Sequence, residues 1–180
     1  MNSKLVLYTA QTEIVIESLE KTGEYFVKKE YIEKKYGQVA FIMLQAYDWF
    51  ISIFKEKVSK PETGEYPVWL FSDPKYAKVS SLQKVIKLEI PKDEVILFDN
   101  RGWERILACS YVGIDRIDED KFDNKMRLQG IDCGFTAFEK PFYPQIKSEI
   151  KNSWNRIFDI DKDNVLRGAT WMLKKEWIVE

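Results

Sequence analysis

The strongest constraint on the fold is an amphipathic stretch from Gln38 to Val58. Apolar residues recur in it at the spacing of one face of an α-helix: Val39, Ile42, Met43, Ala46, Phe50, Ile53 and Phe54. Tyr47 and Trp49 widen this apolar stripe, which indicates a helix that is covered on two sides. Such a helix needs an apolar partner surface, for which one face of a sheet is suited.

Short runs rich in β-branched and aromatic residues predict that sheet. They lie at 5–9, 66–71, 85–90 and 95–98, and a further strand is expected at 166–173. We therefore expect an α+β fold with a small, mostly antiparallel split sheet and the helix at 38–58 packed across it. The length of 180 residues is typical of one domain, so a single domain over residues 1–180 is expected.

Further helices are expected around the strands. Residues 13–19 are predicted as a helix that Thr12 begins and Gly23 ends, because these residue types favour helix starts and stops. A short helix is capped by Asp99 or Asn100, a longer one spans 147–158, 115–125 is a loop or short helix, and 174–179 is a short helix or strand.

The chain contains no histidine. This excludes Ser-His-Asp and Cys-His mechanisms, histidine-ligated zinc and histidine as a proton shuttle. The two cysteines, Cys109 and Cys133, are isolated and do not form a zinc site without histidine. Any chemistry must therefore use carboxylates, Lys, Tyr, Ser, Thr, Cys or a metal on oxygen ligands.

Charge gives little support for a nucleic-acid partner, because the formal net charge is −1. Lys28, Lys29, Lys34 and Lys35 are interleaved with acidic residues, which favours a solvated helix over a nucleic-acid site. The sequence shows neither a signal-peptide core nor a membrane-length apolar stretch, so a cytoplasmic protein is expected.

Arginine is distributed unevenly: all six residues, Arg101, Arg105, Arg116, Arg127, Arg156 and Arg167, lie beyond position 100. Because a guanidinium group binds phosphate or carboxylate with two parallel hydrogen bonds, an anion site would draw on this half of the chain. Six surface or interface arginines are the alternative interpretation.

Two acidic segments resemble metal sites only in part. Residues 159–164 follow the first half of a calcium loop, but Asn164 and Thr170 stand where glycine and a bidentate glutamate are needed. The acidic run from Asp115 to Asp123 would offer oxygen ligands to Mg²⁺, and a solvated loop is the alternative. No metal site is predicted, and glycine-rich phosphate-binding motifs are absent from the sequence.

The remaining polar set surrounds the first strand and consists of Tyr8, Thr9, Gln11 and Thr12. Side chains alternate along a strand, so Tyr8 and Thr9 are expected on opposite faces. A hydroxyl and an amide at the end of a strand are able to hold a flat polar ligand such as a carboxamide. Turn and cap chemistry is the alternative explanation of the same residues.

Four groups of residues together resemble a known family over nearly the whole chain. They are Leu7-Tyr8-Thr9-x-Gln11-Thr12, Pro67-Val68-Trp69, Leu88-Glu89-Ile90-Pro91-x-Asp93-Glu94-Val95 leading to Trp103, and Ser153-Trp154-Asn155-Arg156-Ile157-Phe158-Asp159 followed by Ala169-Thr170-Trp171. The family is an uncharacterised bacterial one with a domain of unknown function (number 3841). The resemblance implies no activity.

A second resemblance is more distant. The strand with Tyr8 and Thr9, followed by a helix that ends in glycine, is similar to the opening of ADP-ribosyltransferases of the DNA- and RNA-modifying toxin type. The tail from Gly168 to Ile178 resembles their last strand and turn. In those enzymes a glutamate on that strand stabilises the oxocarbenium ion as nicotinamide leaves, and a histidine or arginine stands on the first strand.

This chain departs from that pattern at both positions. Thr9 stands at the first-strand position, and the last strand offers Arg167, Gly168 and Thr170 without a carboxylate. The resemblance therefore implies a degenerate or rebuilt active site, with NAD as the cofactor. If the protein is active, Glu89, Asp99 or Glu176 would have to supply the carboxylate.

Two hypotheses follow. The first is a cytosolic bacterial or phage protein, ADP-ribosyltransferase-like, that binds NAD or a related nucleotide ligand in a cleft lined by Tyr8, Thr9, Gln11, Thr12, Tyr66, Trp69, Trp103 and Thr170. The alternative is a non-catalytic protein–protein interaction module, because six tryptophans and nine tyrosines exceed what a small core needs.

Overall fold

A computed structural model describes residues 3–30, 34, 37, 40–77, 80–161 and 163–179. The chain divides into two compact units. The first, here called the sheet unit, contains Met1–Gly37, Tyr47–Leu97 and Val165–Glu180. The second, the helical unit, contains Gln38–Ala46 and Phe98–Asn164. The single domain over residues 1–180 stays a prediction.

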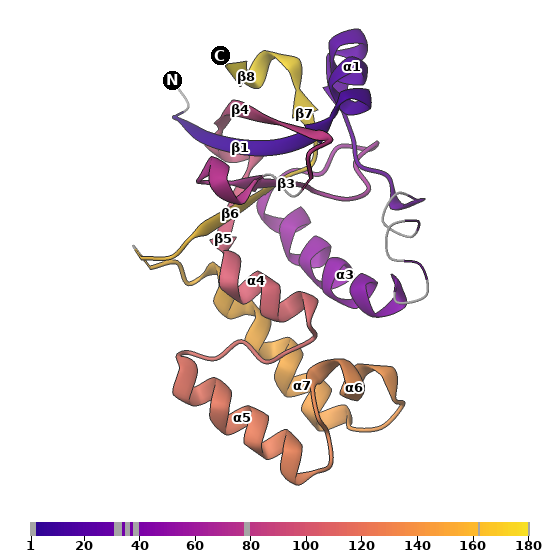
Figure 1. The fold of residues 1–180 in the computed structure, drawn as a ribbon, viewed down its shortest axis with the longest axis vertical. Coiled ribbons are helices and arrows are strands. Elements are labelled where there is room, and N and C mark those ends of the chain that lie inside the picture. Colours follow the sequence, from indigo (N-terminus) through magenta and orange to yellow (C-terminus); the bar gives the residue numbers. More distant parts are fainter. Residues whose placement is uncertain are drawn as a thin grey trace. The chain divides into compact units, whose positions relative to one another are not determined.

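The main sheet is open, has six strands and is mostly antiparallel (Figure 1). Its strands in spatial order are β5 (Ile96–Asp99), β6 (Leu166–Thr170), β3 (Val68–Phe71), β1 (Lys4–Thr12), β4 (Gln83–Pro91) and β8 (Ile178–Val179). Two short strands, β2 (Glu24–Tyr25) and β7 (Leu173–Lys174), form a separate antiparallel ribbon. The predicted α+β fold with a mostly antiparallel sheet is confirmed.

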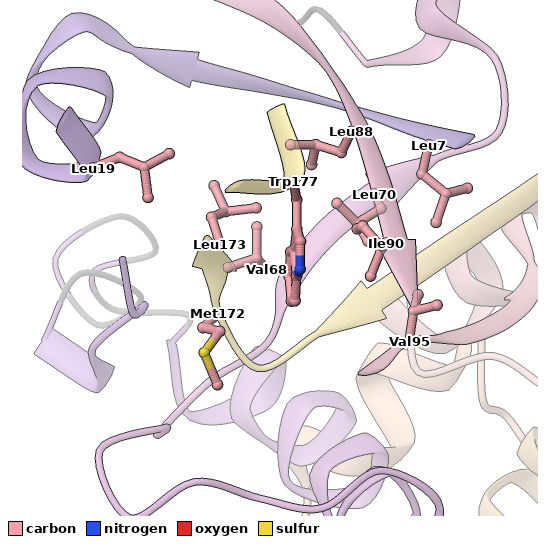
Figure 2. Packing of buried hydrophobic residues seen from close by; sticks show 10 residues of the cluster. All are labelled: Leu7, Leu19, Val68, Leu70, Leu88, Ile90, Val95, Met172, Leu173 and Trp177. Carbon is pink, nitrogen blue, oxygen red and sulfur yellow. The ribbon is translucent and has the colours of Figure 1, made fainter. Parts of the chain in front are cut away.

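One face of the main sheet carries a core of apolar side chains, most of them aliphatic (Figure 2). Leu7 of β1 and Leu88 of β4 lie directly opposite each other and both belong to this cluster. Helix α1 (Glu13–Thr22) adds Leu19 to the cluster, and the segment after β6 adds Leu173 and Trp177. This face is called the core face below.

The opposite face of the sheet is covered by aromatic residues of helix α3 (Ala40–Lys57). Within the sheet unit, the Phe50 ring lies 5.2 Å from the Trp69 ring, and the Phe54 ring stacks on Trp171 at 4.3 Å. The Trp171 indole Nε1 donates to the Val58 carbonyl at 3.0 Å. The helix predicted at 38–58 is confirmed over Ala40–Lys57, and this aromatic packing explains the width of its apolar stripe.

The entry from β1 into α1 follows the predicted local signals. Thr12 occupies the N-cap position, although its side chain makes no capping hydrogen bond. Gly23 ends the helix in the left-handed conformation with φ 80°, and its N–H donates to the Leu19 carbonyl at 2.9 Å. A side chain at this φ would be strained, so glycine is the residue type that fits.

The helical unit contains α4 (Asn100–Leu107), α5 (Arg116–Leu128), α6 (Gly134–Glu139) and α7 (Pro144–Ser153), which continues into the 3₁₀ helix η4 (Trp154–Phe158) (Figure 1). Asp99 rather than Asn100 caps α4. The helix predicted at 147–158 begins earlier, at Pro144, and tightens into a 3₁₀ helix at Trp154. Short 3₁₀ turns in the sheet unit are η2 (Pro74–Tyr76), η3 (Lys92–Glu94) and η5 (Lys175–Trp177).

The segment 115–125 belongs to a helix of 13 residues and not to a loop. Asp115 caps this helix, since its side chain accepts from the Asp118 N–H, and Phe122 and Met126 are buried. Its acidic residues therefore sit on a packed helix. Among the described helices, none is both long enough and apolar enough to cross a membrane.

Candidate functional site

Three of the predicted site residues, two on β1 and one on the neighbouring β3, are joined by hydrogen bonds. The Thr9 hydroxyl donates to the Trp69 carbonyl at 3.0 Å, and Gln11 Nε2 donates to Thr9 Oγ1 at 2.8 Å. Thr9 is 1% exposed, whereas Gln11 is half-buried. Thr9 therefore fixes the orientation of the Gln11 carboxamide and leaves its oxygen and one N–H for another partner.

Thr170 shares the face of the sheet that carries this pair. Side chains alternate between the two faces along β1, so Leu7, Thr9 and Gln11 share one face. This is the core face, because Leu7 belongs to the core cluster together with Val68. Val68 lies directly opposite Thr170, so the two side chains share that face. Thr170 is 0% exposed, and its hydroxyl has no hydrogen-bond partner among the residues that the structure describes.

The other predicted residues of the sheet unit point elsewhere. Tyr8 and Thr12 alternate with Thr9 on β1 and so lie on the opposite face, where Tyr8 faces Phe71. The Trp69 ring lies 5.6 Å from the Tyr47 ring in an edge-on contact. The Tyr66 ring lies 5.8 Å from the same Tyr47 ring. Only the backbone carbonyl of Trp69 takes part in the Thr9 pair.

Trp103 belongs to the helical unit and is 1% exposed. Its ring meets Phe98 edge-on at 5.9 Å, so it forms part of the core of that unit.

The structure gives each of the three carboxylates considered for catalysis its own position and contacts. Glu89 alternates with the core residues Leu88 and Ile90 on β4, which places it on the opposite face, 3.8 Å from Lys4 Nζ. Asp99 belongs to the helical unit, where it caps α4. Glu176 lines an open cavity of about 550 Å³ beside Gly23 and Lys174.

A second group of polar residues, in the helical unit, holds the loop at 110–114. Its carbonyl groups accept hydrogen bonds from three side chains, two of which are 44 positions away in the sequence. Trp154 Nε1 donates to the Ser110 carbonyl at 2.9 Å, Arg105 Nε donates to the Tyr111 carbonyl at 2.6 Å, and Arg156 Nη1 donates to the Val112 carbonyl at 2.7 Å. A loop outside helices and strands must satisfy its backbone groups in this way.

The N–H groups of the same loop are also bound by side chains. Ser153 Oγ accepts from Val112 at 2.9 Å, Glu119 Oε1 from Gly113 at 3.3 Å and Asp118 Oδ2 from Ile114 at 3.1 Å. Five of the six side chains that hold the loop come from α5 and from the segment at 153–156. Ser153, Trp154 and Arg156, which belong to one of the family-like groups of residues, therefore have a structural role.

Two glycines let the backbone approach closely here. A Cβ at Gly113 would lie 2.5 Å from Glu119 Cγ and 2.6 Å from the Asp115 carbonyl oxygen. A Cβ at Gly102 would lie 2.8 Å from Ile157 Cγ2, so α4 and η4 pack closely only because this position lacks a side chain.

Three arginines of this unit, Arg101, Arg105 and Arg156, contact carboxylates. Glu119 is 3% exposed and contacts the guanidinium groups of Arg101 and Arg105. Arg156 Nη1 lies 3.3 Å from Asp118 Oδ2. The N–H of Ile114 is the main cause that lowers the pKa of Asp118, with contributions from the Tyr111 hydroxyl and from Arg156.

A cavity of about 520 Å³ opens beside the loop. The residues that line it include Asp99, Arg101, Val112, Ile114, Arg156 and Asp159. The sequence interpretation placed an anion site or surface arginines in this half of the chain. The burial of Glu119 and its contacts with two arginines were not predicted, because the sequence does not show which arginines approach it.

Residues 6–179 match the family model described as Domain of unknown function (DUF3841). The chain belongs to this family. The family carries no described activity, and the match covers both the sheet unit and the helical unit. Neither a curated protein nor a solved structure matches the chain.

Proposed function

We propose that this chain is an ADP-ribosyltransferase-like protein that binds NAD or a related nucleotide on the core face of its sheet. The observation that carries the proposal is the fully buried Thr170 hydroxyl, which has no described hydrogen-bond partner, on the same face as the Gln11 carboxamide. An unpaired buried hydroxyl costs about 1–3 kcal/mol, and such groups are often retained for function.

The chemistry of these residues suits a carboxamide such as nicotinamide. Gln11 is held by Thr9 and keeps an acceptor oxygen and a donor N–H, which matches the donor and acceptor of another primary amide. Thr170 adds a hydroxyl that both donates and accepts. A short movement of the residues that cover Thr170 would be part of binding, since the side chain is fully buried.

The proposed role is binding, with catalysis only through a rebuilt site. Glu89 lies on the opposite face of the sheet from the core-face polar residues, and Asp99 belongs to the helical unit, where it caps α4. An oxocarbenium-like transition state requires a nearby negative charge, which Thr9, Gln11 and Thr170 do not supply. The order of β1, α1 and Gly23, with β6 near the end of the chain, supports the resemblance on which the proposal rests.

Isothermal titration calorimetry with NAD tests the proposal. We expect wild-type protein to bind, Gln11→Leu to bind roughly tenfold more weakly and Thr12→Val to bind like wild type. Thr12 is a matched control because it lies on the same strand, is exposed and makes no capping hydrogen bond. Absence of both NAD binding and nicotinamide release by the wild type would overturn the proposal.

The interaction module remains the alternative, with less to support it. Trp103, Trp154, Trp171 and Trp177 are at most 3% exposed, and Trp49 and Trp69 are half-buried. The aromatic excess is thus used largely in the two cores. Co-purification of a stoichiometric protein partner that protects an exposed aromatic such as Phe142, which is 64% exposed, would favour it.

A further inference from the structure

We infer that the cavity beside the 110–114 loop binds a positively charged alkyl group, namely the side chain of a lysine or an arginine presented by a polypeptide. The inference is independent of NAD binding, because the cavity is formed by residues of the helical unit alone. Its volume of about 520 Å³ is ample for one such side chain.

The charges around the cavity favour a cation over an anion. Arg101 and Arg156 both line it, but each is already in contact with a carboxylate, Glu119 and Asp118 respectively. Glu119 also contacts Arg105, which in turn lies 3.7 Å from Asp123, so Arg101 and Arg105 are balanced by two carboxylates and Arg156 is balanced by Asp118. The two arginines therefore do not give the cavity a net positive charge that would attract phosphate.

Two further carboxylates line the cavity without a cationic partner among the described residues. Asp99 Oδ2 accepts from the Gly102 N–H at 2.6 Å, which leaves the other oxygen of that carboxylate available. Asp159 is exposed, and the structure gives its side chain neither an ion pair nor a hydrogen bond. The charges of Asp99 and Asp159 thus remain uncompensated and would attract an ammonium or guanidinium group.

The wall of the cavity suits the hydrocarbon part of the same side chain. Val112 and Ile114 line it, and Ile114 is 80% exposed. Lysine and arginine bury their methylene groups on such surfaces while the charged end meets carboxylates. Because six side chains hold the loop backbone, this wall is formed before a ligand arrives, which lowers the entropic cost of binding.

Agmatine, a butylammonium with a guanidinium group, is a suitable probe for an NMR titration of the full chain. We expect concentration-dependent shifts of the Gly102, Gly113 and Ile114 amide signals, with a dissociation constant on the order of 1 mM that rises with added salt. Asp159→Asn is expected to weaken binding by about tenfold. Asp163→Asn removes the same charge from an exposed position in the same segment, does not line the cavity and should bind like wild type.

Three results would overturn the inference. One is the absence of shifts at these amides in wild-type protein, and a second is equal weakening by Asp159→Asn and Asp163→Asn. The third is a response to inorganic phosphate in place of agmatine, which would mean that the two arginines dominate the cavity. An Asp159→Lys variant adds a check, because its own ammonium group should abolish agmatine binding while leaving the folded spectrum intact.

Discussion

The two units use polar side chains in opposite ways. In the sheet unit, strands satisfy one another's backbone groups, so the hydroxyl of Thr170 is left without a described partner and the Gln11 carboxamide keeps hydrogen-bonding capacity. In the helical unit, the 110–114 loop does not pair with a strand. Its backbone groups instead form hydrogen bonds with the side chains of Ser153, Glu119 and Arg156. The sheet unit thus leaves hydrogen-bonding groups available to a ligand at Gln11 and Thr170, whereas the polar side chains around the 110–114 loop satisfy its backbone.

The largest expected effect on the free energy of unfolding is at Glu119, whose buried carboxylate contacts two arginines of the helical unit. Glu119→Gln removes the only charge that contacts both Arg101 and Arg105 in the described structure. Breaking a buried pair costs about 3–5 kcal/mol, and the exposure of Arg101 places the expected loss near the lower end, about 3 kcal/mol. Urea denaturation followed by tryptophan fluorescence measures it. Asp120→Asn, an exposed change on the same helix, should be nearly neutral, and equal effects of the two variants would contradict this role.

Gly113→Ala tests the close approach between the loop and α5. The added methyl group would lie 2.5 Å from Glu119 Cγ and 2.6 Å from the Asp115 carbonyl oxygen, so the loop or the helix must shift. We expect a loss of about 1–3 kcal/mol, again from urea denaturation. Unchanged stability, with unchanged Gly113 and Ile114 amide exchange, would mean that the loop is not held tightly.

Ser153→Ala tests a single hydrogen bond of the loop. The buried Val112 N–H would lose the acceptor that lies at 2.9 Å, and an unsatisfied buried donor costs about 1–3 kcal/mol. Faster hydrogen exchange at Val112 should accompany the loss of stability. Ser148→Ala on the same helix is the control, since Ser148 is exposed. A stable variant with protected Val112 would show that this bond contributes little.

Substitution of Asp118 is expected to have a smaller effect on stability, and one that depends on pH. The pKa of Asp118 is lowered in the folded protein, chiefly by the Ile114 N–H, so its stabilising contribution is present above the ordinary aspartate pKa. That contribution is lost as the pH falls through the lowered value. Denaturation measured from pH 7 to pH 2 should therefore show a shallower acid decline for Asp118→Asn than for wild type. Identical pH profiles would contradict the assigned cause.

Local signals predicted much of the fold. The spacing in α3, the start of α1 after Thr12 and its end at Gly23 are all encoded within a few residues. The pattern of α5 was ambiguous because it is mostly charged, and only the distant Arg101 and Arg105 explain why Glu119 is buried.

The site was harder to predict than the fold. Alternation on β1 correctly separates Tyr8 from Thr9, but it does not reveal that Thr9 holds Gln11. The residues that bind the 110–114 loop include Ser153 and Trp154, which are 41 and 44 positions from the groups they contact. Nothing in the local sequence predicts such pairings.

Thr170→Val offers the most direct test of the central claim, that the core-face polar residues are kept for a ligand. Valine has nearly the shape of threonine and removes the unpartnered hydroxyl. We expect the variant to be as stable as wild type or more stable, by about 1 kcal/mol in urea denaturation without NAD, and to bind NAD roughly tenfold more weakly. Lower stability together with unchanged NAD affinity would show that the hydroxyl serves the fold, and would contradict the claim.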